Sequence, residues 1–250
     1  MDAMWYYYIG VIVLIVLWFL AIVIFSEQIR KSVFAEFFTC RLISLWNESM
    51  FLTSKYYQLE NFSELKAETS DGQLKVLEVG VGEGTNFELY PPNCKLTAFE
   101  YNEYFKKKFT ENVKKFSKIK LEKFVNGFVE DMHVLKDNTF DVVLCTHVLC
   151  SVSDVPAGLK EIKRVLKEGG KFFFIEHVAY EPICLGNEFW TVVQGLLEPI
   201  WKIIMGGCCL RKTTFVDLEK AGFSTVTVTR EYSPRLPAIL RPHIWGCAVK

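Results

Sequence analysis

The sequence predicts an α/β fold in which a mostly parallel sheet follows a hydrophobic N-terminal segment. From residue 71 onward, short apolar runs alternate with longer amphipathic stretches, which is typical of parallel strands joined by helices. Only the short, proline-containing segment 233–243 separates the last two strand-like runs. No crossover helix fits there, so we expect these two strands to pair antiparallel. Ahead of all of them, the run from Met4 to Phe25 carries no charged side chain.

Composition supports one globular domain behind that hydrophobic run. The chain has 29 basic and 29 acidic side chains, and half of its residues are hydrophobic. The hydrophobic excess is concentrated in the first 25 residues, and the remainder suits a single domain with a sizeable core. The zero net charge excludes a nucleic-acid binder that works through overall positive charge, so we expect no nucleic-acid partner.

The run from Met4 to Phe25 predicts an uncleaved membrane anchor over residues 1–28. A helix of this length measures roughly 33 Å, enough for the ~30 Å hydrocarbon core of a bilayer. A cleaved signal peptide is disfavoured because Asp2, not a basic residue, precedes the run. A buried core helix is disfavoured because it would be apolar all round. Arg30 and Lys31 follow the run, which places the rest of the chain in the cytosol. Spanning and single-leaflet anchors both remain open.

Residues 29–70 mix apolar and charged side chains at helical spacing. We expect amphipathic helices there, either on the membrane surface or covering the domain formed by residues 71–250. Within that domain, seven apolar runs predict strands: Lys75–Val79, Lys95–Glu100, Leu121–Asn126, Phe140–Thr146, Gly170–His177, Ser224–Tyr232 and Ile244–Val249. The lysine-rich stretch 106–123 is interpreted as the solvated face of a helix or, alternatively, as a surface attracted to anionic lipid.

A glycine-rich loop follows the first predicted strand and opens the candidate ligand site. Gly80, Gly82 and Gly84 stand in the sequence VLEVGVGEGTNF. Glycines let a backbone turn sharply and approach a ligand at the carboxyl edge of an open α/β sheet. The spacing differs from the dinucleotide fingerprint, because Thr85 occupies its third glycine position, and no lysine follows as a phosphate-binding loop would need.

A glycine-rich loop alone could be a turn without any ligand. Two nearby glutamates indicate a specific ligand for this one. Glu100 ends the second strand, where a carboxylate can accept hydrogen bonds from both ribose hydroxyls of a nucleoside. Glu78 precedes the loop and can face the amino-acid end of S-adenosylmethionine, through its ammonium group or a bridging water. We therefore expect an S-adenosylmethionine site.

Three further residues are candidates for the same site. Asp131 follows the third strand and could accept a hydrogen bond from the adenine amino group, while the backbone amide of Met132 could reach the ring. The alternative for Asp131 is a helix N-cap, and the two roles are compatible. Thr146, at the end of the fourth strand, completes the set.

The acceptor side is predicted at the ends of the fourth and fifth strands. His147 and His177 lie there, and either could act as a general base near neutral pH, although a buried structural histidine is the commoner case. The apolar stretch 180–210 could form a lid, with Cys150, Phe189, Trp190 and Trp201 lining a substrate pocket, or it could simply pack in the core.

The eight cysteines form no C-x-x-C pair and show no regular spacing. Neither a zinc site nor a disulfide framework is indicated, so we expect no metal. Reduced thiols agree with a cytosolic domain, and most are expected to be small buried residues.

Taken together, these motifs resemble the methyltransferase-like 7 family, whose members are described as membrane-associated thiol S-methyltransferases of the endoplasmic reticulum and lipid droplets. The resemblance covers nearly all of the chain after residue 28. The cysteine-bearing fourth-strand motif and the C-terminal stretch carry it most specifically. The matching stretches are LEVGVGEGTNF (77–87), YPP (90–92), EDMH (130–133), DVVLCTHVLCSV (141–152), EHVA (176–179), GCCL (207–210) and RPHIWGCAVK (241–250).

Three positions depart from the family pattern. The family usually has Asp at Glu100, a small residue at Val129 and Leu at His147. Glu100 keeps the carboxylate. A family that works with leucine at position 147 cannot depend on a base there, which leaves His177 as the preferred candidate.

The resemblance implies a class I, Rossmann-like methyltransferase with a seven-stranded sheet whose last strand is antiparallel. It also implies S-adenosylmethionine as methyl donor, small hydrophobic alkyl or aryl thiols as acceptors, and membrane lipids as partners. The expected location is the endoplasmic reticulum membrane and lipid droplet, with the domain facing the cytosol. A thiol suits a site without a strong base or metal, because its pKa of ~8.5 leaves a reactive thiolate fraction at neutral pH. The alternatives are a lipid or another small oxygen or nitrogen acceptor, or a non-enzymatic lipid-droplet adaptor.

Overall fold

The computed structural model describes residues 59–66, 72–181, 187–233 and 236–250. The anchor expected over residues 1–28, and most of the helical segment expected over 29–70, lie outside these ranges. Across the part of the chain that is described, no helix is both long and apolar enough to cross a membrane.

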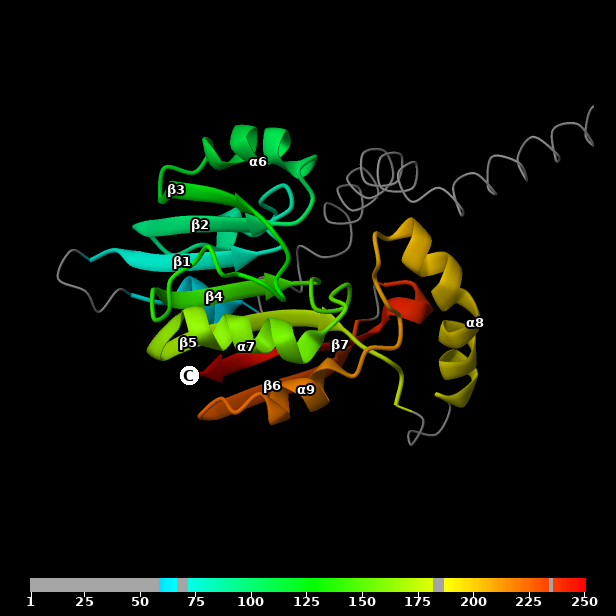
Figure 1. Ribbon diagram of the computed structural model, residues 1–250. Helices are drawn as coiled ribbons and strands as arrows, with labels where there is room; N and C mark the ends of the chain where they lie inside the picture. Colours follow the sequence, from blue (N-terminus) through cyan, green and yellow to red (C-terminus); the bar gives the residue numbers. More distant parts are fainter. Residues whose placement is uncertain (1–58, 67–71, 182–186, 234–235) are drawn as a thin grey trace, which may run out of the picture.

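The domain is built on one seven-stranded sheet with the order β3-β2-β1-β4-β5-β7-β6 (Figure 1). Each strand predicted from the sequence is present, and β4 has the predicted bounds. The strands are β1 (Leu74–Val79), β2 (Cys94–Glu100), β3 (Ile119–Asn126), β4 (Phe140–Thr146), β5 (Leu166–His177), β6 (Thr225–Tyr232) and β7 (Pro242–Val249).

Strand direction confirms the predicted fold class. The pairs β1–β2, β2–β3, β1–β4 and β4–β5 are parallel, whereas β7 runs antiparallel to both β5 and β6. The segment between β6 and β7 is too short for a crossover, so β7 returns beside β6 and enters the sheet between it and β5. The carboxyl ends of β1, β2, β4 and β5 therefore share one edge, where open α/β sheets bind ligands.

Helices cover both faces and the carboxyl edge of this sheet (Figure 1). One of them, α7, begins where the Asp154 side chain accepts a hydrogen bond from the backbone N–H of Ala157 at 3.0 Å. It packs against β5 and α9. The elements are α5 (Glu60–Ser63), η3 (Phe87–Leu89), α6 (Phe105–Val113), α7 (Val155–Val165), α8 (Glu188–Ile204), α9 (Thr214–Lys220) and η4 (Ala238–Leu240).

Two apolar cores result, one on each face. The first includes Leu159, Ile162 and Leu218 from α7 and α9, packed on the buried strands. The second includes Phe62 of α5 and Phe109 of α6. Because the central strands are buried on both sides, they read as continuous apolar runs, which made them visible in the sequence.

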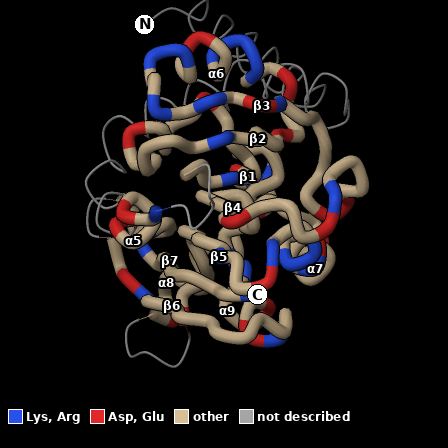
Figure 2. Tube along the Cα trace, turned by 90° about the vertical axis from the view of Figure 1, so that its left-hand side faces the viewer, with Lys and Arg blue, Asp and Glu red and all other residues tan. Residues whose placement is uncertain are grey.

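The lysine-rich stretch 106–123 has the expected solvated helix face only within α6, because its last five residues belong to β3. In α6 the apolar side chains Phe105, Phe109 and Val113 are buried, while the lysines between them face solvent. Figure 2 shows basic and acidic residues interspersed around α6 and β3. This mixture makes α6 a polar surface helix anchored by its apolar side.

Candidate active site

The glycine loop turns sharply at the carboxyl end of β1, and its three glycines have different constraints. All three adopt positive φ, at 65° for Gly80, 52° for Gly82 and 83° for Gly84. A Cβ added at Gly80 would lie 2.2 Å from Val148, and one at Gly84 would lie 2.0 Å from the Phe87 ring. A Cβ at Gly82 would meet nothing within 4 Å. Two glycines are therefore required by packing, whereas Gly82 borders open space that a ligand can use.

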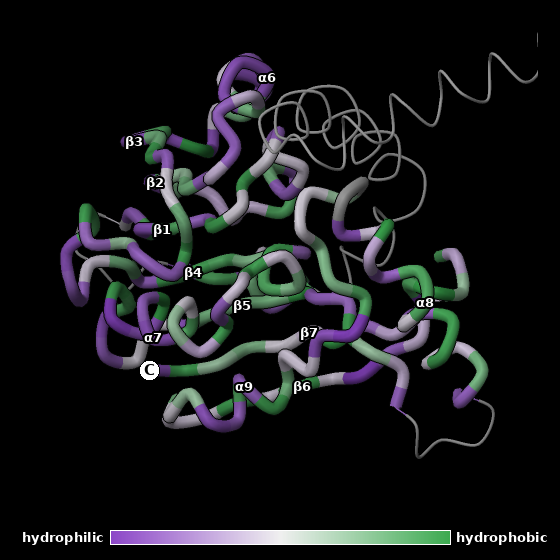
Figure 3. The backbone as a smooth tube through the Cα atoms, turned by 45° about the vertical axis from the view of Figure 1, so that its right-hand side comes forward, coloured by the Kyte–Doolittle hydropathy of each residue, from purple (hydrophilic) through white to green (hydrophobic). Residues whose placement is uncertain are grey.

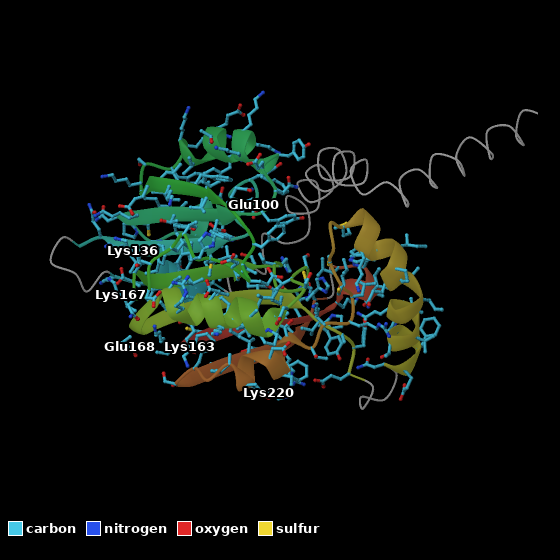
Figure 4. The ribbon with its side chains drawn as sticks, viewed as in Figure 1. Glu100, Lys136, Lys163, Lys167, Glu168 and Lys220 are labelled. Carbon is cyan, nitrogen blue, oxygen red and sulfur yellow. The ribbon has the colours of Figure 1, made fainter. Side chains whose placement is uncertain are left out.

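Glu100 joins this loop to the end of β2. Its Oε2 accepts a hydrogen bond from the backbone N–H of Gly82 at 2.9 Å, and its Oε1 accepts from the N–H of Asn102 at 3.0 Å. Burial raises the pKa of the carboxyl group, while these backbone hydrogen bonds oppose the rise. Figure 4 shows Glu100 at the carboxyl edge of the sheet, with Lys136, Lys167 and Glu168 at the opposite end. The carboxylate is thus positioned where the sequence places the ribose of a nucleoside.

Glu78 lies beneath the loop and orients two residues that the sequence analysis did not single out. Its Oε1 accepts from the amide of Asn86 at 2.7 Å, and its Oε2 accepts from the Tyr90 hydroxyl at 2.5 Å. The Asn86 amide also donates to the Thr146 hydroxyl at 2.6 Å. The structure therefore brings Glu78 and Thr146 together, as expected, through Asn86. Asn86 and Tyr90 stand in the family-matching stretches, but their spacing alone gives no functional signal.

Two buried polar atoms at this edge test whether a polar ligand fits. Asn86 Oδ1 and Asn102 Nδ2 are both buried and have no hydrogen-bond partner among the described residues. An unpaired buried polar group costs about 1–3 kcal/mol, so such atoms favour a ligand that pairs with them. Together with the open space beside Gly82 and the Glu100 carboxylate, they fit the polar ends of S-adenosylmethionine.

The structure differs from the sequence analysis at Met132, and among the described residues no helix begins directly after Asp131 as the N-cap alternative would require. The Asp131 side chain is exposed and faces His133 Nδ1 at 2.8 Å. The backbone N–H of Met132 donates to a Glu161 carboxylate oxygen at 2.8 Å, so this amide is already paired and the expected contact with an adenine ring is not available to it. The Met132 side chain is instead fully buried in the core.

Two exposed aromatic side chains lie at the same edge, where the sequence analysis expected Asp131. Tyr101 follows Glu100, Phe128 follows β3, and their rings stack with centroids 5.9 Å apart. An Asn126 amide hydrogen donates to the Tyr101 carbonyl at 2.9 Å and ties the two strand ends together. An apolar surface beside a ribose-binding carboxylate is suited to a purine ring.

On the acceptor side, His177 lies against a cysteine. Its Nε2 is 2.8 Å from Cys208 Sγ, and both side chains are buried. The pKa of the Cys208 thiol is lowered, first by its hydrogen bond with Cys150 and then by His177. Burial lowers the pKa of His177, but Cys208 and Glu176 outweigh it and the net direction is upward. Each of the two groups therefore favours the charged form of the other.

The general-base role of His177 stays a prediction, since Nε2 is turned to Cys208 and Nδ1 is buried without a partner among the described residues. His147 lies on the far side of His243 from His177. Its Nε2 is 3.2 Å from His243 Nε2, and its φ is 55°. Burial, followed by the charge of His177, lowers the pKa of His243 to about 4. His243 therefore lies between the two predicted histidines as a neutral neighbour, and the sequence analysis did not include it.

Glu176 fixes the loop that follows β4. Its two carboxylate oxygens accept from the backbone N–H groups of Val148 at 2.9 Å, Leu149 at 2.9 Å and Cys150 at 3.2 Å. Burial raises the pKa of Glu176 to about 7, against the lowering effect of these hydrogen bonds. One buried side chain thus sets the position of Cys150.

The four residues predicted to line one substrate pocket are not brought together. Cys150 and Trp201 both approach Cys208, and the Trp201 indole N–H donates to its Sγ at 3.3 Å. Trp190 stacks on Tyr180 instead. Phe189 is 65 % exposed and lies twelve residues before Trp201 on the same helix, which separates them by roughly 18 Å. Phe189 therefore does not line an enclosed pocket with Cys150.

Helix α8 turns much of its apolar side outward, whereas a lid over a pocket would pack that side inward. Five large apolar side chains of α8 are exposed, Leu196 being 73 % exposed, whereas the polar Gln194 is fully buried. Gln194 accepts from the Tyr180 backbone N–H at 3.1 Å and donates to the Ile239 carbonyl at 2.9 Å. Figure 3 shows α8 as a largely hydrophobic element beyond the carboxyl edge. The outward apolar face consists of Phe189, Val192, Leu196, Leu197 and Ile200.

Comparisons with known proteins agree with this site. A family model described as a methyltransferase domain matches residues 77–174, which include the glycine loop, Glu100 and β4. Human thiol S-methyltransferase TMT1A is 38% identical over 214 residues, covering 86% of this chain and 85% of that protein. Human thiol S-methyltransferase TMT1B is 43% identical over 192 residues, covering 76% and 77%. A solved SAM-dependent methyltransferase from Thermotoga maritima shares the fold, with a TM-score of 0.57 at 19% identity over 86% of this chain and 99% of that one.

Proposed function

The chain belongs to the family of thiol S-methyltransferases, and from that membership we propose that it methylates small hydrophobic alkyl or aryl thiols at a membrane surface. The family resemblance inferred from its motifs, the class I methyltransferase fold and the requirement for S-adenosylmethionine are confirmed by these relatives and by the matching family model. The choice of acceptor and the membrane location are the parts we propose.

The donor side follows from the residues around Gly82. When bound, S-adenosylmethionine supplies a methyl group already activated by its positive sulfonium sulfur. Glu100 would hold the ribose hydroxyls, and Asn86, placed by Glu78 and Thr146, would pair with the polar amino-acid end. Because the donor is already activated, the protein mainly has to align the reactants.

On the acceptor side, the observation that carries the proposal is a set of contacts to a buried sulfur atom beside the donor edge. The His177 imidazole and the Trp201 indole N–H both lie against the buried Cys208 Sγ, so this part of the edge provides polar nitrogen groups suited to a sulfur atom. An incoming thiol with a pKa of ~8.5 needs little further activation, whereas a hydroxyl acceptor would need a strong base. This difference favours thiols over alcohols and phenols.

The outward apolar face of α8 supports the membrane location. Contiguous exposed apolar surface of this kind marks a contact with lipid or another apolar partner. A helix with one such face can lie in the interfacial plane of a bilayer, where hydrophobic thiols concentrate. We propose the cytosolic surface of the endoplasmic reticulum and of lipid droplets, with membrane lipids as partners and the N-terminal segment 1–28 as anchor.

An acceptor panel tests the proposal. The full chain is incubated with methyl-labelled S-adenosylmethionine and, separately, alkyl thiols, aryl thiols, phenols, amines and lipid vesicles. We expect labelled thioethers from the thiols, with turnover rising with acceptor hydrophobicity. Labelled lipid without any thioether would contradict the proposal and favour a lipid methyltransferase, and no binding of the donor by calorimetry would favour a non-enzymatic adaptor.

A further inference from the structure

A cluster of three buried side chains lies beside the donor edge and includes the His177–Cys208 contact described above. Cys150 comes from the loop after β4, His177 ends β5, and Cys208 follows α8. One ligand atom from each lies within 4.8 Å of the other two, and all three residues are buried. No zinc-binding spacing is visible in the sequence, because the three residues come from separate segments that only the fold brings together.

Independent contacts hold these atoms in place. Glu176 Oε2 accepts from the Cys150 backbone N–H at 3.2 Å. The Cys150 carbonyl accepts from the Cys209 N–H at 2.9 Å, which joins the two cysteine-bearing loops. The Trp201 indole donates to Cys208 Sγ at 3.3 Å. Contacts of this kind orient the ligands of a metal site and stabilise the charge on a coordinating sulfur.

Two cysteine sulfurs and one imidazole nitrogen are the ligand set that suits zinc. Zinc–sulfur bonds of about 2.3 Å and zinc–nitrogen bonds of about 2.0 Å in a tetrahedron place neighbouring ligand atoms roughly 3.5 Å apart. The three atoms, all within 4.8 Å of one another, need only a small adjustment to reach that spacing. We infer that Cys150, His177 and Cys208 bind a zinc ion.

The fourth coordination position of the zinc ion indicates what else the site binds. No fourth histidine, cysteine or acidic side chain of the described part of the chain joins the group. Three protein ligands and an open position are typical of catalytic zinc rather than structural zinc. Resting on the proposed function, the inference assigns the open position to the acceptor thiol.

Binding there activates the acceptor without a general base. The thiol S–H bond breaks, its proton leaves to water, and the sulfur keeps the electron pair that forms the bond to zinc. No electron is transferred to or from the protein. His177 is then a zinc ligand through Nε2, which replaces the general-base role predicted from the sequence.

Metal content of the purified full chain is the first test. We expect one zinc ion per chain by elemental mass spectrometry, with zinc affinity falling at least about tenfold in Cys150→Ser and Cys208→Ser. Cys209→Ser is the matched control, because this neighbouring sulfur faces the Gly207 carbonyl and Lys202 and is not part of the cluster. Donor binding by calorimetry confirms that each variant is folded, since the donor loop is separate from the three ligands.

The second test replaces zinc with cobalt and uses absorbance as the readout. We expect a sulfur-to-cobalt charge-transfer band that changes when benzenethiol is added without any donor, and that does not change with methyl phenyl sulfide. Equal metal content in wild type and Cys208→Ser, or a zinc-free protein with a Cys150–Cys208 disulfide, would overturn the inference.

These outcomes separate the inference from the proposed function. Thiol methylation by a fully metal-free protein would remove the zinc site and leave the function standing. Stoichiometric zinc with no methylation of any thiol would remove the function and leave the zinc site standing.

Discussion

We expect Glu100 to control donor affinity, because its carboxylate is held at the carboxyl edge by two backbone hydrogen bonds. Glu100→Gln keeps the shape but places an amide where a carboxylate oxygen faces the Gly82 N–H. Hydrogen bonds to a charged group are worth about 1.5–3 kcal/mol, so we expect donor affinity to fall roughly 10- to 100-fold. Calorimetric titration with S-adenosylmethionine measures this, with Glu103→Gln, on the exposed surface nearby, as the control. Unchanged affinity in Glu100→Gln would remove Glu100 from the donor site.

The raised pKa of Glu100 gives donor binding a pH dependence. Burial holds its pKa above the ordinary glutamate value, so the carboxyl group takes up a proton at a higher pH than an exposed glutamate. Only the ionised form offers all its oxygen lone pairs to ribose hydroxyls. We therefore expect donor affinity to be constant above this pKa and to fall as the pH drops through it. The affinity of Glu100→Gln should lack this dependence, and an identical profile in both proteins would contradict the assignment.

Gly80 and Gly82 of the loop can be compared directly by substituting each with alanine. Gly80→Ala places a methyl group 2.2 Å from Val148 at positive φ, so we expect a loss of about 1–3 kcal/mol in the free energy of unfolding. Gly82→Ala meets no neighbour, so it should lose less stability but obstruct the donor. Thermal unfolding and donor titration on both variants check this contrast. Tight donor binding by Gly82→Ala would show that the open space beside it is not the ligand site.

Single residues also show where sequence patterns stop being informative. Glu78, Glu100 and Thr146 were predictable because they stand at strand ends that share an edge. Met132 was not, because its amide is paired with Glu161 of a distant helix, a contact that no local pattern records. The His177–Cys208 contact likewise joins two segments that the sheet and α8 bring together.

Among the helices and strands, α8 shows the largest difference between the role expected from the sequence and the observed orientation. The apolar stretch 180–210 was expected to form a lid or to pack in the core, but an apolar pattern cannot tell which side of a helix faces the protein. The buried hydrogen bonds of Gln194 turn its polar side inward. The strands were easier to predict, because burial on both faces leaves an apolar run whichever side is considered.

The outward apolar face of α8 predicts membrane binding that depends on Leu196 and Ile200. Leu196→Glu and Ile200→Glu place charges on side chains that are 73 % and 60 % exposed, so the fold should tolerate them. We expect reduced binding to lipid vesicles and unchanged donor affinity. Val134→Glu is the control, since Val134 is also an exposed apolar residue but lies outside α8. Equal vesicle binding by all three variants would exclude α8 as a lipid contact.

At the scale of the whole molecule, the seven-stranded sheet and its carboxyl-edge site are built from residues between Leu74 and Val249. We expect deletion of residues 1–25 to move the protein away from membranes and to leave donor affinity unchanged. Cell fractionation and calorimetry on the same truncated chain provide the two readouts. Loss of donor binding on truncation would show that the segment is part of the fold rather than a tether.

At the scale of the whole molecule, the proposed function requires that the methyl group be transferred to sulfur rather than to oxygen. A matched pair of acceptors tests this requirement. The full chain is given methyl-labelled S-adenosylmethionine and equal amounts of benzenethiol and phenol, which have the same ring and differ in the attacking atom. The account predicts labelled methyl phenyl sulfide and no labelled anisole, because the thiol ionises more readily and is the stronger nucleophile. Anisole as the main product, or label found only in lipid, would contradict it.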